Sequence, residues 1–455
     1  MKPARIAADA LEREIDVVGR GIAARLPNAA AHPIRAIDER IMQATTRDRE
    51  LRAALFRLVD VTPACRSLDD LARHLAGFAA EVEDRPKPLD AAIQAARTKA
   101  GRVTLGAAVA GGVRHMAHRF IAGESPARAT AELARLWDAG IGSSVDLLGE
   151  ATVTSDEADR YLARCLEALE VLAAATADYA AHPLLDRDPG GRLARANLSV
   201  KVSALTPLIR PEHPRSGVDD AVRRMRPLLR AARQLGAHLH IDTESVDTRE
   251  TTTELLFELL GEPEFQAGPS IGIVVQAYLR DSAAELERLL DRVDGAGREQ
   301  PLGIRLVKGA YWDHEVVEAD QQGWSPPVFE KKADCDRNFE LLSRSLLDRV
   351  HREPRGVRVA IGSHNLRSVA HAVAYSRLAG ADPPALEVQV LRGLGDDLAR
   401  ALADSGLRTR VYCPVGDLVA GMAYLVRRLL ENTANSSFLS EQADGTPLEQ
   451  LLAPP

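Results

Sequence analysis

The run RLVKGAYWD at residues 305–313 holds a dense group of side chains that could do chemistry. Arg305 and Lys308 bring two positive charges to one short segment, and Gly309 allows a ligand or a second backbone to come close. Tyr311 and Trp312 then offer flat surfaces on which a ring system could lie. These residue types suit an anionic ligand that carries a ring, although solvated charges beside a buried tryptophan would give the same run.

A second run, HLHID at residues 238–242, places polar side chains at alternate positions. His238, His240 and Asp242 would share one face of a strand, and a His-x-His pair is also how some hydrolases hold a divalent ion. Such a site needs further ligands from other strands, and His364 is the only other histidine in a comparable place. Polar packing is therefore the preferred interpretation and no metal is predicted, with a metal-dependent hydrolase as the alternative.

A third run, AYLVRRLLENTANSSF at residues 423–438, reads as a helix. Glu431 follows Arg427 by four residues and Arg428 by three, so its carboxylate could hold either guanidinium. Two adjacent arginines that a glutamate orients could bind a small carboxylate through paired hydrogen bonds. A solvated ladder on a surface helix has the same spacing, so spacing alone leaves both interpretations open.

Eight short β-rich segments, each followed by a helical stretch, would position these runs. They lie at residues 143–150, 197–205, 237–244, 270–278, 302–311, 357–365, 386–393 and 408–416. Eight alternating βα units favour a closed (β/α)8 barrel over an open doubly wound sheet. An open sheet would also be expected to carry a G-x-G-x-x-G turn after an early strand, and none occurs there.

The barrel predicts where the site lies, because polar residues at the C-terminal ends of its strands face the active site. The residues at those ends are Glu150, Lys201, Asp242, Gln276, Arg305, Lys308, Ser363, His364, Asn365, Gln389 and Tyr412. Burying several such groups is costly unless they are paired or bound to a ligand. The set therefore favours a site for a large polar ligand.

Residues 1 to about 135 read as successive helices, with apolar residues at three- and four-residue spacing and no strand-like run. The helical pattern breaks at EDRPKPLD (83–90), where two prolines forbid a continuous helix. We therefore expect an α-helical arm and cap domain at 1–135, followed by a barrel domain at 141–455.

Composition narrows the class of protein. The chain of 455 residues has 58 Lys and Arg against 65 Asp and Glu, a net charge of −7, which argues against non-specific binding of nucleic acid. Its four cysteines are far apart and form no C-x-x-C pair, so neither a disulfide framework nor a zinc site is predicted. No apolar run suits a signal peptide or a membrane span. We expect a cytoplasmic protein, at most peripheral to a membrane.

Together these runs resemble a known family. NLSVKVSAL, HIDTES, VVQAY, RLVKGAYWD, SHN, VQVLRGLG and VYCPVG, followed by YLVRRLLENTANSSF, are similar in order to proline dehydrogenase, and specifically to the proline dehydrogenase portion of bifunctional bacterial proline utilisation A. The N-terminal helices resemble that protein's arm and α-domain less distinctively. The resemblance implies a distorted (β/α)8 barrel that binds FAD. It also implies oxidation of L-proline to Δ1-pyrroline-5-carboxylate, the first step of proline catabolism to glutamate, by hydride transfer from C5 to flavin N5, with electrons passed to membrane quinone.

The resemblance also assigns residues. Arg427 and Arg428 match the pair that grips the proline carboxylate, and Glu431 matches their ion-pair partner. The other positions around the substrate are Lys201, Asp242, Leu306, Tyr311 and Tyr412. Arg305 matches the arginine near flavin N5, and the remaining flavin positions are Asp242, Gln276, Val307, Lys308, Gly309, Ala310, Trp312, Lys332, Ser363, His364, Asn365, Gln389, Leu391, Arg428 and Glu431. In PVFEKK (327–332), Glu330 stands where the family usually has threonine, a departure at the adenosine end of FAD.

Two further expectations concern the extent of the chain. The bifunctional relatives continue into an aldehyde dehydrogenase module, whereas this chain stops at LLAPP, so that module would act in cis in a longer protein or in trans. No basic β-strand leader precedes Ala10, so binding to DNA as a repressor is not expected. A non-catalytic scaffold that only keeps the fold is the remaining alternative.

Overall fold

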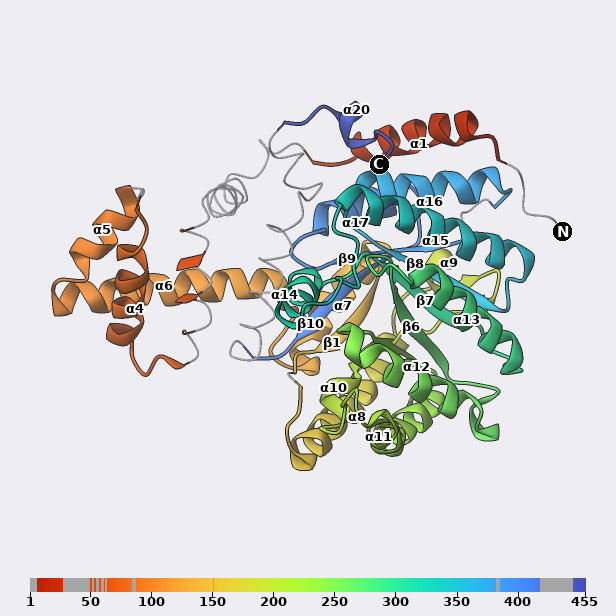
Figure 1. The fold of residues 1–455 in the computed structure, drawn as a ribbon, viewed down its shortest axis with the longest axis horizontal. Helices are drawn as coiled ribbons and strands as arrows, with labels where there is room; N and C mark the ends of the chain where they lie inside the picture. The colour runs from red at the N-terminus through yellow and green to blue at the C-terminus, as the bar shows by residue number, and fades with distance from the viewer. Residues whose placement is uncertain are drawn as a thin grey trace.

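A closed barrel of eight parallel strands forms the centre of the computed structural model (Figure 1). The structure describes residues 6–27, 64–83, 87–149, 151–381, 385–417 and 445–455, together with 50, 53–54, 57–58 and 61. Four of the predicted site positions, Glu150, Arg427, Arg428 and Glu431, lie outside these residues.

The strands confirm all eight of the predicted segments. They are β1 (Ile141–Leu147), β4 (Asn197–Lys201), β5 (His238–Asp242), β6 (Ser270–Gln276), β7 (Leu302–Val307), β8 (Val357–Gly362), β9 (Glu387–Leu391) and β10 (Thr409–Val415). Around the barrel they follow the order β1-β10-β9-β8-β7-β6-β5-β4, and pairing of β1 with β4 closes the ring. The predicted segment at 197–205 ends as a strand at Lys201, because the short helix α10 (Val202–Leu205) follows directly.

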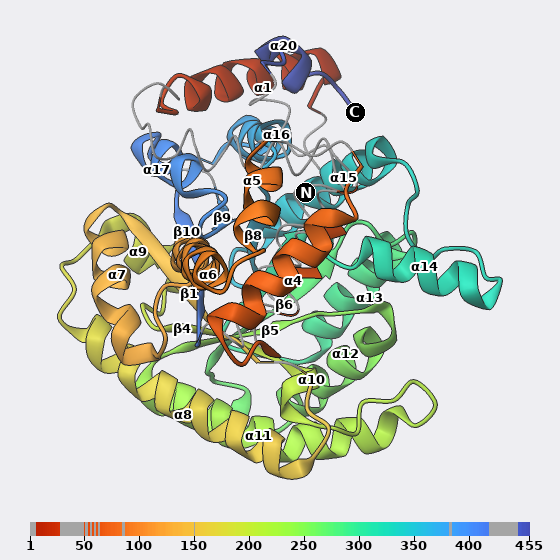
Figure 2. The ribbon, with the colours of Figure 1, turned by 90° about the vertical axis from the view of Figure 1, so that its left-hand side faces the viewer.

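Helices surround this ring (Figures 1 and 2). Those among the described residues are α8 (Ser155–Ala177), α11 (Pro214–Leu235), α12 (Val246–Leu260), α13 (Ser282–Gly295), α14 (Trp312–Gln322), α15 (Lys332–Arg352), α16 (Leu366–Leu378) and α17 (Asp396–Asp404). Apart from α14, which packs on a separate cluster of Tyr278, Leu279 and Val328, their apolar faces and the outward faces of the strands form one hydrophobic core. A small hairpin of β2 (Arg187–Asp188) and β3 (Gly191–Arg192), which follows α9 (Pro183–Asp186), lies beside the N-terminal ends of the strands.

The N-terminal helices that the structure describes occupy three separate places. Helix α1 (Ala8–Ala23) lies along α16, close to the C-terminal helix α20 (Leu448–Leu451), whereas α7 (Pro126–Asp138) packs on α8 and β1. Helices α4 (Leu68–Ala80), α5 (Lys87–Ala95) and α6 (Lys99–Phe120) project from the barrel as an arm (Figure 1). The helical content of the described residues agrees with the sequence pattern, but this distribution could not be inferred from it.

Both chain-end segments meet one side chain of the barrel layer. Arg367 of α16 donates from Nη1 to Glu12 Oε2 of α1 at 2.6 Å and to the backbone oxygen of Leu452 at 2.7 Å. Its Nε donates to Glu340 Oε1 of α15 at 2.9 Å. The buried guanidinium thereby ties α1, α15, α16 and the segment after α20 together.

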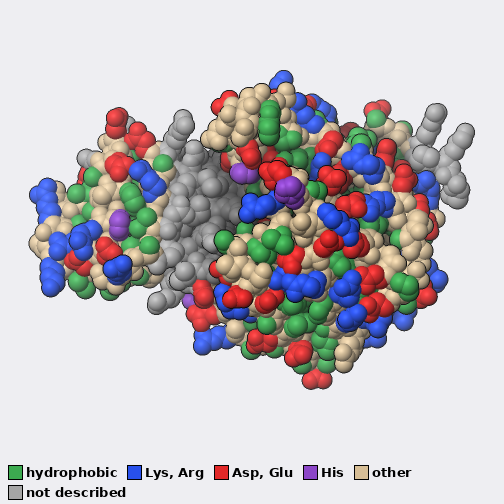
Figure 3. Space-filling view, turned by 60° about the horizontal axis from the view of Figure 1, so that its bottom comes forward, with side chains coloured by type: hydrophobic (Ala, Val, Ile, Leu, Met, Phe, Trp, Pro, Cys, Tyr) green, Lys and Arg blue, Asp and Glu red, His purple; other side chains and the backbone are tan. Residues whose placement is uncertain are grey.

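Basic and acidic side chains are interspersed on the face shown in Figure 3, with no large patch of one sign. Of the helices that the structure describes, none has the length and apolar character needed to cross a membrane.

Candidate active site

The interior of the barrel is polar, and Arg305 of β7 lies at its centre with only 6% of its side chain exposed. Its Nη1 donates to Asp242 Oδ1 at 2.7 Å, and its Nε donates to Gln389 Oε1 at 2.6 Å. Nη2 lies 3.3 Å from the hydroxyl of Ser199 and 3.5 Å from that of Ser144. Strands β1, β4, β5 and β9 therefore all help to fix the guanidinium.

Asp242 joins the arginine to two other predicted residues. The Tyr412 hydroxyl donates to Asp242 Oδ2 at 2.6 Å, and Lys201 Nζ lies 3.9 Å from the same oxygen. Lys201 also pairs with Asp146, which the sequence analysis did not single out. The guanidinium of Arg305 lies over the Tyr412 ring, 5.3 Å from its centroid. Two carboxylates, two cations and a phenol thus form one buried group.

Burial and charge decide which of these groups carry protons. Burial alone would lower the pKa of Lys201, but the neighbouring Asp146 and Asp242 outweigh it and raise that pKa. Burial, with the same two carboxylates, raises the pKa of Tyr412 well above its usual value. At neutral pH Lys201 is therefore an ammonium and Tyr412 a protonated phenol.

Two buried acceptor oxygens at the strand ends have no partner among the described residues. Asp146 Oδ2 is one, and burial raises the pKa of its carboxyl. Gln276 Oε1 at the end of β6 is the other. The Nε2 atom of the same amide does have a partner, since it donates to the backbone oxygen of Glu244 at 2.9 Å. Buried polar atoms in native proteins are nearly always satisfied, so these oxygens point to a ligand that brings donors.

The loop after β7 continues the site. Lys308 pairs with Asp336 of α15, and Lys332 lies 3.5 Å from the same carboxylate, so two cations share one anion. Gly309 has φ of +133°, and a Cβ there would overlap the ring of Tyr278, so this turn requires glycine. Trp312 donates from Nε1 to the backbone oxygen of Phe329 at 2.9 Å.

The side chains after β8 have local partners. Asn365 Oδ1 caps α16 by accepting from the Ser368 amide at 2.9 Å, and Ser363 Oγ accepts from the Asn365 amide at 3.1 Å. His364 Nε2 accepts from the Leu391 amide at 2.8 Å. These bonds shape the loop and hold it against β9.

The structure thus brings many of the predicted residues to one end of the barrel. Lys201, Asp242, Arg305, Gln389 and Tyr412 form the contacts above, while Gln276, Val307, Lys308, Gly309, Ala310, Tyr311, Trp312, Lys332, Ser363, His364, Asn365 and Leu391 lie at or after C-terminal strand ends. Leu306 is not among them, because it faces away from Arg305 on β7 and lies fully buried in the hydrophobic core. Glu330 forms a surface ion pair with Arg280, with 2.9 Å between Oε1 and Nη2.

Sequence reasoning missed several partners in this region, among them Asp146, Ser199 and Asp336. The first two had a detectable signal, since polar residues alternate in the first strand (Ser144, Asp146) and in the second (Asn197, Ser199, Lys201) just as they do in HLHID. Asp336 comes from a helix, where a carboxylate four residues after a lysine resembles any surface pair.

The HLHID histidines pack against each other within the barrel. His238 Nε2 lies 3.2 Å from His240 Nδ1, and His238 Nδ1 lies 2.8 Å from Ser270 Oγ. Burial, reinforced by nearby arginines, lowers the pKa of His238 to about 3. These contacts support the interpretation that the histidines of HLHID serve polar packing inside the barrel.

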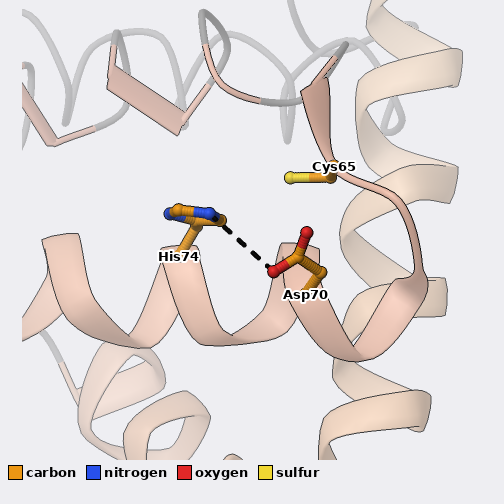
Figure 4. A group of neighbouring side chains, drawn as sticks. All are labelled: Cys65, Asp70 and His74. Atoms are coloured by element: carbon orange, nitrogen blue, oxygen red, sulfur yellow. Dashed lines mark ion pairs between the residues drawn. The ribbon is translucent and has the colours of Figure 1, made fainter.

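A different group in the described part of the chain has donor atoms within 4.8 Å of one another, namely Cys65, Asp70 and His74 of the arm (Figure 4). His74 is 43% exposed, and Asp70 Oδ2 already accepts from the Arg66 amide at 3.2 Å. Three donors, one of them exposed and one engaged at a helix start, do not make a closed metal site.

The buried histidines predict an acid-sensitive fold. His238 has a pKa of about 3 when folded and about 6.5 when unfolded, so the unfolded chain binds its proton first as pH falls. Between pH 7.5 and 5.5 this histidine should lower the free energy of unfolding by about 1.4 kcal/mol. The groups that act on it are Arg410, Arg305, Arg358, Glu387 and His240.

Urea unfolding at both pH values checks this. His238→Gln should lose less stability on acidification than the unchanged chain, and His213→Gln, at an exposed position, should lose the same amount as the unchanged chain. Equal pH dependence in all three proteins would contradict the assignment.

Comparison with known proteins places this geometry in a family. A family model described as proline dehydrogenase matches residues 129–441, and one described as the proline utilization A N-terminal domain matches residues 12–120. Bifunctional protein PutA of Salmonella typhimurium is 34% identical over 357 residues, which are 75% of this chain and 25% of that protein. Proline dehydrogenase 1 of Bacillus subtilis subsp. natto is 26% identical over 332 residues, 72% of this chain and 90% of that one.

Solved structures agree. Proline utilization A from Bdellovibrio bacteriovorus inactivated by N-propargylglycine superimposes with a TM-score of 0.87 at 34% identity, over 97% of this chain and 43% of that one. The chain thus spans less than half the length of that structure and a quarter of the Salmonella relative. Since the proline dehydrogenase model matches more than half of the residues, the chain belongs to the proline dehydrogenase family.

Proposed function

We propose that this chain is an FAD-dependent proline dehydrogenase, which oxidises L-proline to Δ1-pyrroline-5-carboxylate. The observation that carries the proposal is the buried group in which Asp242 and Gln389 hold Arg305, with Lys201 and Tyr412 bound to the same aspartate. When bound, FAD supplies the acceptor for the hydride that leaves C5 of proline.

The described residues fit such a cofactor. Arg305, Lys308 and Lys332 supply cations for an anionic ligand, and the unpartnered Gln276 Oε1 supplies a buried acceptor for its ring donors. The required glycine at 309 keeps the loop after β7 close to Tyr278 without a side chain between them. Trp312, which is held by its bond to Phe329, can flank a ring system.

Towards the substrate, the chain contributes fixed charges. Lys201 stays protonated because two carboxylates face it, which suits a carboxylate-bearing substrate. Asp146 balances that charge and keeps one buried acceptor oxygen, which suits a substrate with an amine. Arg427 and Arg428 are proposed to bind the carboxylate directly, and Glu431 to orient them. Positioning by such groups can supply much of a rate enhancement.

The proposal extends to the partners. Electrons are passed to a quinone during transient contact with the inner membrane by a cytoplasmic protein, and the product passes to an aldehyde dehydrogenase module in cis or in trans. The quinone, the membrane contact and the aldehyde dehydrogenase module are proposed because the chain belongs to the proline dehydrogenase family.

A direct test measures flavin and proline oxidation together. The purified chain should show a flavin spectrum, release FAD on denaturation, and reduce a redox dye when proline is added. Stoichiometric zinc without flavin would instead support the metal-dependent hydrolase, and bound flavin without proline oxidation would support the scaffold.

Tyr412 should set substrate preference. In the family the matching tyrosine packs on the proline ring near C4, so trans-4-hydroxyproline should be the poorer substrate, and Tyr412→Ser should narrow the difference in kcat/KM. Tyr412→Phe is the control, because it removes only the 2.6 Å bond to Asp242 and keeps the ring. Equal discrimination in the unchanged chain and in Tyr412→Ser would contradict this role.

A further inference from the structure

A buried chain of hydrogen bonds leads from the N-terminal end of the barrel to Arg305. Arg410 of β10 donates to Glu387 of β9 through two bonds, Nε to Oε1 at 2.7 Å and Nη2 to Oε2 at 3.0 Å. Gln389 Nε2 donates to Glu387 Oε1 at 2.7 Å, and Arg305 Nε donates to Gln389 Oε1 at 2.6 Å. Glu387 and Gln389 lie two residues apart on one strand, so both side chains point into the barrel.

The amide of Gln389 has one satisfied orientation in this chain. A carboxylate only accepts hydrogen bonds and a guanidinium only donates them. The amide nitrogen must therefore face Glu387, and the amide oxygen must face Arg305. If the group at 387 could also donate, the amide could turn over and present its NH2 to the guanidinium, where two donors would oppose each other.

Arg410 keeps Glu387 ionised and in place. Burial alone would raise the pKa of Glu387, but the adjacent Arg410 outweighs it and lowers that pKa. Arg410 is itself fixed by a bond to the neighbouring strand β1, since its Nη1 donates to the backbone oxygen of Ser143 at 2.8 Å. Glu387 is thus an acceptor in a fixed position throughout the neutral pH range.

Glu387 lies at the end of the barrel opposite the candidate active site. With Arg410 and His238 it lines a cavity of about 70 Å³ at the N-terminal strand ends, beside the β2–β3 hairpin. Its effect on a ligand must therefore pass through Gln389 and Arg305. The same cavity is lined by a second buried ion pair, Arg358–Asp188, with 2.8 Å between Nε and Oδ2, which has no bond to Gln389 or Arg305.

We propose that Glu387 is a positioning residue for the oxidation reaction, because it fixes the Gln389 amide and thereby the place of the Arg305 guanidinium beside the cofactor. This inference rests on the proposed function. Asp242 holds Nη1 of the guanidinium and Gln389 holds Nε, so loss of the Gln389 contact leaves the cation held only by Asp242 and by the two longer serine contacts.

The test compares two isosteric changes that each neutralise one acid of the same cavity. Glu387→Gln should lower kcat about 10- to 100-fold, the effect of loosening a hydrogen bond to a charged group, with little change in KM. It should also move the midpoint potential of bound FAD to more negative values. Asp188→Asn should lose comparable stability in urea but keep the kcat, KM and potential of the unchanged chain.

An exchange variant guards against a folding defect. In Glu387→Gln combined with Gln389→Glu, the new carboxylate faces Arg305, and the new amide can donate to it while it accepts from Arg410. This variant should recover kcat in part. If Glu387→Gln alone does not fold, recovery in the exchange variant supports the proposal, and a folded exchange variant without recovery overturns it.

Equal behaviour of Glu387→Gln and Asp188→Asn in kcat and potential would show that Glu387 only stabilises the fold. That result differs from failure of the proposed function, in which the unchanged chain itself would lack FAD or proline oxidation and no variant would matter.

Discussion

Replacement of Arg427 or Arg428 by Met is expected to lower kcat/KM for L-proline roughly 30- to 1000-fold. Each change would remove a charge-assisted contact to the substrate carboxylate, worth about 2–4 kcal/mol in a site that excludes water. FAD should be retained, because its proposed contacts come mainly from β6 to β9. Steady-state kinetics of proline oxidation, together with the flavin content of each variant, measure the effect.

Glu431→Ala should act in the same direction but more weakly, because it frees the arginines without removing them. Arg230→Met is a matched control, since Arg230 forms an exposed ion pair with Glu264 on the outer layer and should change stability by no more than about 0.5 kcal/mol. Normal proline kinetics in both Arg427→Met and Arg428→Met would leave a solvated arginine ladder as the better account of this run.

Asp242→Asn is expected to affect both stability and activity. The carboxylate accepts from Arg305 at 2.7 Å and from Tyr412 at 2.6 Å, and only 13% of its side chain is exposed. The asparagine amide is neutral, so the buried Arg305 loses its counter-charge. The amide also has only one acceptor oxygen in place of two. The free energy of unfolding should fall by about 3–5 kcal/mol. The value of kcat/KM should fall roughly 100-fold or more, because one of the two contacts that orient the site is lost and the other loses its charge.

Asp220→Asn separates these two effects. Asp220 has the same exposure of 13%, pairs with the buried Arg224 and accepts from Thr206 at 2.6 Å, but it belongs to the outer helix α11 and not to the strands that carry the site. Its replacement should cost comparable stability in urea unfolding while kcat/KM stays normal. If both asparagine variants lost activity equally, the loss at Asp242 would reflect a weakened fold.

The architecture was predictable because each strand is a short β-rich run bounded by a helix, a pattern that local sequence carries. The charged group inside the barrel could be anticipated for the same reason, since Lys201, Asp242 and Arg305 occupy inward-facing positions of these short strands. Leu306 shows the limit of residue matching, because strand alternation turns it away from Arg305 into the hydrophobic core.

Pairings between distant segments could not be predicted. Glu387 lies in the predicted segment 386–393 with no indication of a partner, and only the closed barrel brings it to Arg410 and, through Gln389, to Arg305. Asp336 likewise needs the packing of α15 on the barrel to reach Lys308. Periodicity determines which face a residue occupies, but the partner across that face depends on the tertiary fold.

The junction at Arg367 has a mechanical consequence. Because Glu12 and the backbone of Leu452 bind the same guanidinium, tension applied between α1 and α20 would be borne first by these short contacts on the surface of α16. The strands would carry load only after that junction had ruptured, because it ties both chain-end segments to α16. The polar interior of the barrel is thereby shielded from strain that enters through the outer helices.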